Sequence, residues 1–160
     1  MSVRLALAMT ACVLPLAACQ PTTGTTSGTL EASPAGLEQV PLTVTTTAGK
    51  VHRFTVEVAR SEAQQAQGLM NRQSLGPDRG MIFPYNPPVA ASFWMKNTLI
   101  PLDIIFIRSD GTIARIEANT VPLSLDPVPA GEPVAAVLEL AGGRAAELGI
   151  TAGAKVAWPG

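Results

Sequence analysis

Residues 102–118 read LDIIFIRSDGTIARIEA, and this stretch predicts most directly how the chain folds. Residues 102–107 are apolar apart from Asp103, and this pattern is typical of a strand that is largely buried. The tripeptide Ser109-Asp110-Gly111 follows it and favours a tight hairpin turn. Residues 112–118 then mix apolar and polar side chains in a roughly alternating pattern, which is typical of a second, half-buried strand. The stretch therefore predicts a β-hairpin.

Strand signals continue on both sides of this hairpin. Two short helices interrupt them, one at 61–68, which begins with a capping box, and one at 142–148. A long proline-rich loop is expected at 119–133. The pattern predicts a mainly β fold, a compact antiparallel β-sandwich or barrel of about eight strands with two short helices, and no βαβ series. The expected strands are 40–46, 51–59, 81–83, 91–97, 102–107, 112–118, 134–140 and 155–158.

The composition limits the classes of function. The chain has 160 residues, of which 47% are hydrophobic and 14% charged, and this suits one domain with a buried core. Eleven basic and 12 acidic residues give a formal charge of −1, and no basic stripe that would bind nucleic acid is present. The cysteines, Cys12 and Cys19, both precede residue 20 and there is one histidine, so the domain offers no usual zinc site and no thiol nucleophile. We expect no cofactor and no nucleic-acid partner.

The N-terminus has the features of an export signal. Residues 1–18 form a signal peptide whose apolar run is too short to span a bilayer. The sequence Leu16-Ala17-Ala18-Cys19 resembles the bacterial lipobox, in which Cys19 is lipidated, although a plain secretory signal is the alternative. Residues 19–37 are rich in Thr, Ser, Gly and Pro and predict a flexible tether. The residue after the lipidated cysteine is Gln20 and not Asp. By analogy with enteric lipoproteins, this favours attachment to the outer membrane, facing the periplasm.

Five short motifs of the remaining chain resemble one protein family. They are GLMNR at 68–72, GMIF at 80–83, FWMKNT at 93–98, IPLDI at 100–104 and VLEL at 137–140. Together they are similar to the DUF192 (UPF0127) family over about residues 40–158. The resemblance implies a small, often exported β domain with a jelly-roll-like sandwich or barrel and no established biochemical activity. It places the domain at 38–160, after the tether.

These motifs also contain the candidate ligand-binding residues. In the functional interpretation, Arg72 and Lys96 meet an anionic ligand, Asn97 and Thr98 supply hydrogen bonds, and Trp94 forms an apolar wall.

The acids Asp103 and Glu139 complete the candidate set. They either belong to the same ligand pocket or have a structural role. In the structural interpretation, the two acids pair with Lys96 and Arg72 and hold loops against the barrel.

Two other chemistries remain open. The thioethers of Met70, Met81 and Met95 would suit Cu(I), although methionine is also a common core residue. A carboxylate pair such as Asp103 with Glu139 would suit an enzyme acting on an envelope sugar or peptide.

The sequence thus predicts a lipid-anchored protein of the cell envelope. Its domain is expected to be a non-catalytic module that binds an unknown small molecule or an envelope protein. The envelope enzyme and the Cu(I)-binding protein are the alternatives. The expected contact with the membrane is the lipid on Cys19.

Overall fold

The structure is a computed structural model that describes residues 33–159. The predicted signal peptide 1–18, Cys19 and the first part of the predicted tether lie outside the described residues. The mainly β fold and the two short helices are confirmed. The elements are β1 (Gln39–Thr45), β2 (Val51–Val58), α1 (Glu62–Gln67), β3 (Arg79–Val89), β4 (Ser92–Phe93), β5 (Leu102–Ile107), β6 (Ile113–Glu117), β7 (Val128–Pro129), β8 (Val134–Ala141), α2 (Arg144–Leu148) and β9 (Lys155–Ala157).

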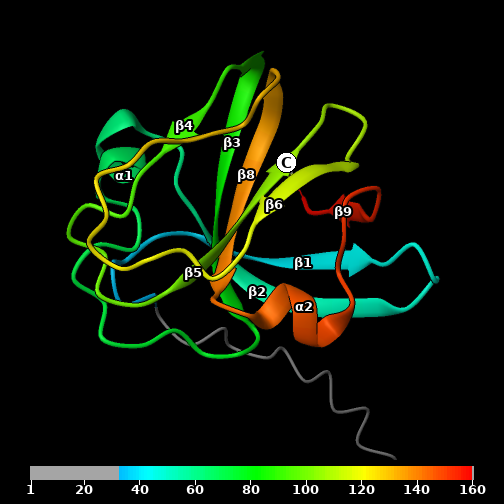
Figure 1. The fold of residues 1–160 in the computed structure, drawn as a ribbon, viewed down its shortest axis with the longest axis horizontal. Helices are drawn as coiled ribbons and strands as arrows, with labels where there is room; N and C mark the ends of the chain where they lie inside the picture. The colour runs from blue at the N-terminus through cyan, green and yellow to red at the C-terminus, as the bar shows by residue number, and fades with distance from the viewer. Residues whose placement is uncertain (1–32, 160) are drawn as a thin grey trace, which may run out of the picture.

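Seven of these strands form one curled sheet in the order β6-β5-β8-β3-β2-β1-β9. The sheet curls so far that β9 meets the chain just before β6, where Thr112 and Lys155 form a single antiparallel bridge (Figure 1). The strand pairs of this sheet are antiparallel except for β2 and β3, which are parallel. The expected antiparallel pairing is wrong at this one pair. A parallel pair needs a crossover connection, and residues 59–78, which contain α1, supply it.

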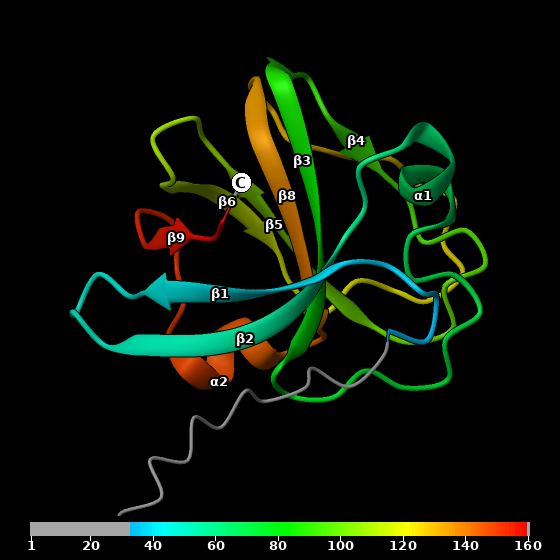
Figure 2. The ribbon, with the colours of Figure 1, turned by 180° about the vertical axis from the view of Figure 1, so that it is seen from behind.

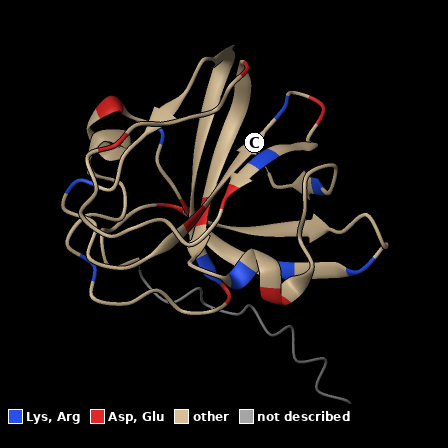
Figure 3. Ribbon diagram, viewed as in Figure 1, with Lys and Arg blue, Asp and Glu red and all other residues tan. Residues whose placement is uncertain are grey.

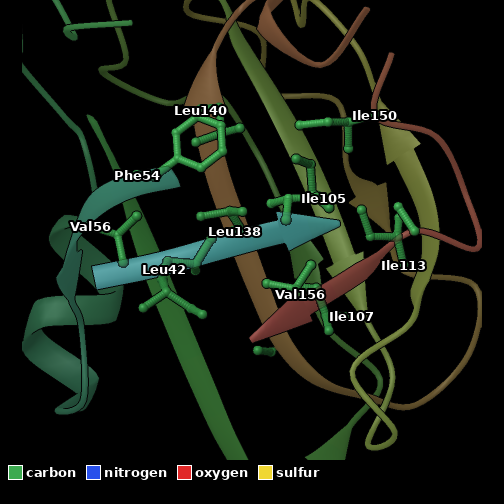
Figure 4. Packing of buried hydrophobic residues seen from close by; sticks show 14 of the residues in the cluster. Leu42, Phe54, Val56, Ile105, Ile107, Ile113, Leu138, Leu140, Ile150 and Val156 are labelled. Atoms are coloured by element: carbon green, nitrogen blue, oxygen red, sulfur yellow. The ribbon is translucent and has the colours of Figure 1, made fainter. Parts of the chain in front are cut away.

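The inner face of the curled sheet carries a core that is aliphatic apart from Phe54. Leu42, Leu138 and Ile105 come from three different strands and point into the same space (Figure 4). Ile150, which follows α2, closes one end of this core. Such a core holds the strands together by removing apolar surface from water, at about 25 cal/mol per Å².

The opposite face of β3, β5 and β8 is covered by loops, α1 and β4 rather than by a second large sheet (Figure 2). The core on this side is richer in aromatic residues. Phe93 meets Phe83 edge to face at 5.0 Å between ring centroids, and Phe106 at 6.4 Å. β4 pairs only with β7, in a separate two-stranded sheet. Because loops cover this face, it can hold a cavity more easily than the aliphatic side.

The strand expected at 81–83 extends to Val89, and its ladder with β8 changes register between Pro84 and Val89. The change of register accommodates the prolines, which cannot donate to a regular ladder. The strand expected at 91–97 is shortened to Ser92–Phe93, because the amide of Met95 bonds to the carbonyl of Ser124 in a neighbouring loop. The expected loop at 119–133 contains the short strand β7.

The described part of the chain contains its own cores. Every residue of the two clusters lies between Leu37 and Trp158. The predicted capping box of α1 is confirmed, since Ser61 accepts from the amide of Gln64 and Gln64 accepts from the amide of Ser61. No helix of residues 33–159 is long and apolar enough to cross a membrane.

Candidate functional site

A cavity of about 370 Å³ lies between α1 and the loop that follows β4. One side of it is formed by the last residues of α1 and the turn that follows, up to Met70. Trp94 and Thr98 lie on the other side, and Glu139 reaches it from β8. Three of the seven predicted ligand-binding residues therefore meet at one hollow. The rest of its lining includes Leu69, Phe83, Tyr85 and Phe93.

Glu139 is the chemically distinctive residue of this cavity. In the register of the sheet it lies between Met81 of β3 and Ile104 of β5, so its side chain shares their face. The residue is 5% exposed, and its Oε2 atom has no hydrogen-bond partner among residues 33–159. Burial raises the pKa of Glu139 from 4.5 to about 8, while the charge of Arg72 acts in the opposite direction. At neutral pH the side chain is therefore mainly a neutral acid, which can donate a hydrogen bond.

Tyr85 adds a second polar group to the same cavity. Its pKa is raised to about 12, first by burial and then by the nearby Glu139. The phenol thus keeps its proton at any physiological pH and can donate or accept a hydrogen bond. Tyr85 and Glu139 are the titratable anchors of a cavity whose lining combines apolar and aromatic side chains with the polar ones of Gln65, Gln67, Ser92 and Thr98.

Arg72 lies beside this cavity and holds a different acid. Its guanidinium donates two hydrogen bonds, of 2.6 and 2.7 Å, to the carboxylate of Glu57. Ser33 adds a third, of 2.6 Å, to the same carboxylate. Both charged side chains are nearly buried, at 13% and 8% exposure. The expected pairing of Arg72 with Glu139 or Asp103 is therefore wrong, because the parallel crossover brings Arg72 back to β2 instead.

Asp103 lies on the other face of the sheet. It is paired in register with Leu140, the neighbour of Glu139, so the two acids point to opposite faces. Its carboxylate is 0% exposed and accepts three backbone N–H bonds, from Asn119 at 2.7 Å, Gly143 at 2.8 Å and Ala145 at 2.7 Å. Asp103 thus ties the 118–120 loop and the start of α2 to β5. It cannot share a substrate with Glu139, so the predicted carboxylate pair is absent.

The FWMKNT motif begins with the last residue of β4, Phe93, and continues as a loop rather than as the expected strand to Asn97. Lys96 is exposed, and its ammonium lies 5.1 Å from the centre of the Trp94 ring. Among the described residues, no carboxylate lies within 4.0 Å of it, so Lys96 does not clamp Asp103 or Glu139. Asn97 has a positive φ of 55°, and its carbonyl accepts from the amide of Asn71. Thr98 is 5% exposed and lines the cavity.

The three methionine sulfurs are not brought together by a shared contact, and Met81 and Met95 are part of the core on the aromatic side of the sheet. Met81 is buried in the sheet at 0% exposure. The sulfur of Met95 accepts a hydrogen bond from the hydroxyl of Thr120, whereas that of Met70 accepts one from Asn97. Residues 33–159 also contain no group of three His, Cys, Asp or Glu side chains that would hold a metal. The geometry favours core packing over a shared Cu(I) site.

A larger hollow, of about 710 Å³, opens elsewhere, next to the β5–β6 turn and β9. Arg60, Arg108 and Trp158 contribute to its walls, and it contains none of the predicted site residues. Arg60 is paired with Glu38 and Arg108 with Glu132. We take the smaller cavity as the candidate site, because a buried acid with an unpartnered oxygen lies in it.

The comparison with family models identifies the domain. The model of DUF192, described as "Uncharacterized ACR", matches residues 43–158. The chain belongs to the DUF192 family. The five motifs quoted above all lie within the matched region.

Two crystal structures resemble this DUF192 domain. A protein of unknown function from Novosphingobium aromaticivorans is 53% identical with a TM-score of 0.77, and the match covers 80% of this chain and 91% of that one. A protein from Sinorhizobium meliloti, described as a proposed transcription regulator, is 41% identical with a TM-score of 0.75, over 76% of this chain and 95% of that one. Both matched chains consist almost wholly of this domain, so these two relatives fold and crystallise with little besides it. The comparison with curated proteins finds no significant match.

The sequence did not predict Tyr85, which lines the candidate cavity, or Glu57, which holds Arg72 beside it. Tyr85 lies in a proline-rich stretch that offered no strand signal beyond Phe83. Glu57 lies on the face of β2 opposite the aliphatic core, where an acid is normally solvated, and its burial depends on Arg72 from beyond α1. An acid midway along an otherwise apolar strand was the available signal for Glu139, and the VLEL motif did contain it.

Proposed function

We propose that this DUF192 domain is a non-catalytic binding module whose ligand enters the cavity over Glu139. The observation that carries the proposal is the buried Oε2 atom of Glu139, which has no hydrogen-bond partner within residues 33–159. Leaving a buried polar atom unsatisfied costs about 1–3 kcal/mol. A ligand with a hydrogen-bond acceptor would recover this free energy. The lining combines aromatic and polar side chains, which favours a ligand with both apolar and polar groups, and Tyr85 gives it a second polar contact.

Binding fits the cavity better than catalysis does. Glu139 and Tyr85 are the titratable groups in its lining, and both are protonated at neutral pH. A hydrolase of the two-carboxylate kind needs a second carboxyl group that faces the same bound substrate across the scissile bond. Asp103, the expected partner, lies behind the sheet with its oxygens occupied by backbone amides. An enzyme acting through Asp103 and Glu139 is thus the weaker candidate.

The charges argue against carrying over the role in transcription named for the Sinorhizobium relative. Basic and acidic residues are interspersed over the described domain rather than gathered in one basic face (Figure 3). The formal charge of the whole chain is −1. Binding to the DNA backbone needs a cluster of Lys and Arg.

The binding module is proposed to act in the cell envelope, attached by a lipid at Cys19. The support for this location is the sequence of residues 1–19, which resembles a lipoprotein signal. Its test is the mass of the N-terminal peptide of the protein expressed in bacteria. A diacylglyceryl group on Cys19 and its loss in Cys19→Ser are expected. An unmodified cysteine would contradict the anchor without affecting the cavity.

Native mass spectrometry of residues 33–159, exported to a bacterial periplasm and purified gently, tests the ligand proposal. We expect an additional mass on the protein, which Glu139→Leu removes because it fills the polar site with an apolar side chain. Glu117→Gln is the matched control, since Glu117 lies in the same cross-strand row but pairs with Arg115 outside the cavity. The proposal fails if the added mass is absent or survives Glu139→Leu.

A further inference from the structure

Large apolar side chains are exposed mainly on two loops of the domain. Of the seven large hydrophobic residues that are exposed in the described chain, five belong to the segments 94–99 and 121–125. We call these five the loop patch. They are Trp94 at 50%, Leu99 at 40%, Val121 at 70%, Leu123 at 57% and Leu125 at 65% exposure.

The two loops of this patch are fixed to one another. The amide of Met95 donates to the carbonyl of Ser124, and the amide of Leu123 donates to the carbonyl of Thr98. Other side chains of these loops point inward: Met95, Thr98 and Thr120 are buried, at 2–7% exposure. The patch therefore lies on loops that are held by backbone hydrogen bonds and by buried side chains.

Leu123 combines an exposed side chain with an unfavourable backbone conformation. Its φ is 64°, in the left-handed region that a leucine rarely adopts. A non-glycine residue in this region costs about 1–2 kcal/mol. The folded chain keeps this backbone strain although the side chain of Leu123 gains no burial from it. A surface contact that removes Leu123 from water would offset it.

The side chains of the patch suit the interface of a lipid bilayer. Tryptophan is enriched at the headgroup level of membranes, and leucine and valine insert below it. Lys96 lies against the Trp94 ring and can meet lipid phosphates while its stem remains with the apolar side chains. The two loops contain one other charged residue, Asp126, at the margin beyond Leu125. Little charge would have to be desolvated.

The described chain begins at the same end of the molecule. Ser33 donates to Glu57, which is held by Arg72. The amide of Asn71, next to Arg72, donates to the carbonyl of Asn97 within the loop that bears Trp94. If the chain is anchored at Cys19 as proposed above, 13 residues (20–32) separate the lipid from the described domain. A connection this short keeps that end of the domain within reach of the membrane surface.

We propose that the loop patch, with Lys96, docks onto the surface of a phospholipid bilayer. Trp94, Leu123 and their neighbours insert among the headgroups, and Lys96 contacts the phosphates. Because Trp94 also lines the Glu139 cavity, docking places one wall of that cavity at the bilayer surface. The orientation of the docked domain rests on the proposed anchor, whereas the affinity of the patch for lipid does not.

The test uses residues 33–159, which have no lipid anchor, and vesicles of phosphatidylethanolamine and phosphatidylglycerol. Trp158→Phe leaves Trp94 as the single tryptophan. We expect the protein to sediment with the vesicles, the Trp94 emission to shift to the blue, and lipids brominated near the headgroup to quench it. Replacing Leu123 by Asn and Leu125 by Ser should weaken partitioning about tenfold or more for each residue. Asn tolerates the left-handed backbone, so the variant should still fold.

The matched control changes the two exposed valines outside the patch, Val51→Ser with Val89→Ser, and should leave partitioning unchanged. A second variant, Lys96→Gln, should weaken binding about fivefold on anionic vesicles and leave binding to phosphatidylcholine vesicles unchanged. Absence of binding by the parent protein overturns the proposal. So does an equal loss in the valine control, or a blue shift that appears only with a lipid-free envelope extract, since this would mean a protein partner. Failure of the anchor or of the ligand proposal is measured separately, by the mass of Cys19 and by the mass of the domain.

Discussion

Asp103 and Glu139 lie on neighbouring strands, one residue apart in register, and both are buried acids in a core of aliphatic and aromatic side chains. They face opposite sides of one sheet. Asp103 accepts three backbone amides that tie α2 and a loop to the barrel. Glu139 has an oxygen without a partner in the described chain, and it lies in a cavity.

The difference follows from what covers each face. On the side of Asp103, α2 and the loop at Asn119 bring backbone N–H groups to the carboxylate, so its charge is stabilised and its acceptors are used. On the side of Glu139, α1 and the Trp94 loop cover the strand, and the Oε2 atom receives no hydrogen bond from residues 33–159. A fully satisfied buried acid stabilises a fold. An unsatisfied one destabilises it, and is a candidate for binding.

The largest expected effect is that of Asp103→Ala. It leaves three backbone amides without their acceptor, and at about 1.5–3 kcal/mol for each bond to a charged group the domain should lose about 5 kcal/mol. Urea unfolding followed by circular dichroism measures the loss. Asp126→Ala is the control, because Asp126 is exposed and bonds only within its own loop, and it should stay within about 0.5 kcal/mol. A loss below about 2 kcal/mol for Asp103→Ala would remove the contrast between the two acids.

The fold was predictable because its signals are local. Apolar runs, the Ser109–Gly111 turn and the capping box at Ser61 each act within a few residues, and all three correspond to observed elements. The parallel pairing of β2 with β3 was not predictable, since it depends on where a crossover of some 20 residues ends.

The site was predictable only in part, and for a related reason. The motifs named Trp94, Thr98 and Glu139, which do meet at one cavity. They did not reveal the partners. Glu57 joins Arg72 across 15 residues, and Asp103 joins Ala145 across 42. Which cation or amide a buried acid receives is decided by packing between distant segments, and alternation along a strand does not encode it.

Arg72→Met should have the second largest effect. Removing one partner of a nearly buried ion pair leaves the charge of Glu57 uncompensated, at a cost of about 3 kcal/mol. This is near the lower end of the usual range, because Ser33 still donates to Glu57. The double variant Arg72→Met with Glu57→Met should regain most of the loss, as apolar replacements of buried pairs often do. Urea unfolding of the parent protein, the two single variants Arg72→Met and Glu57→Met, and the double variant gives the coupling, and strictly additive losses would contradict a direct pair.

Glu139→Gln should act mainly through pH. The folded carboxyl keeps its proton to about pH 8, whereas in the unfolded chain it releases it near pH 4.5. The folded state thus binds more protons between these values, and the free energy of unfolding falls as pH rises from about 4.5 to about 8, by at most about 1.4 kcal/mol per pH unit. The charge of Arg72 lowers the pKa of this carboxyl but does not cancel the effect of burial. Tyr85, whose pKa is raised to about 12, keeps its proton across this range.

Glu139→Gln should flatten this slope and leave the domain more stable than the parent protein at pH 8. Thermal unfolding from pH 5 to pH 8 measures both effects. Glu117→Gln should keep the slope of the parent protein, because Glu117 is partly exposed and paired with Arg115. Parallel profiles for the parent and Glu139→Gln would show that Glu139 is ionised in the fold.

Lys96→Ala should have the smallest effect on stability, at most about 1 kcal/mol, because an exposed cation over an aromatic ring contributes little. If Lys96 clamped a buried acid, the melting temperature would fall by several degrees, as for Arg72→Met. The comparison of these two basic residues mirrors that of the two acids. Arg72 forms an ion pair with Glu57 inside the fold. Lys96 lies beside Trp94 at the edge of the cavity, where its charge can interact with a ligand or a phospholipid. A small change in the free energy of unfolding, together with a clear loss of vesicle binding, would show that Lys96 serves binding and not the stability of the fold.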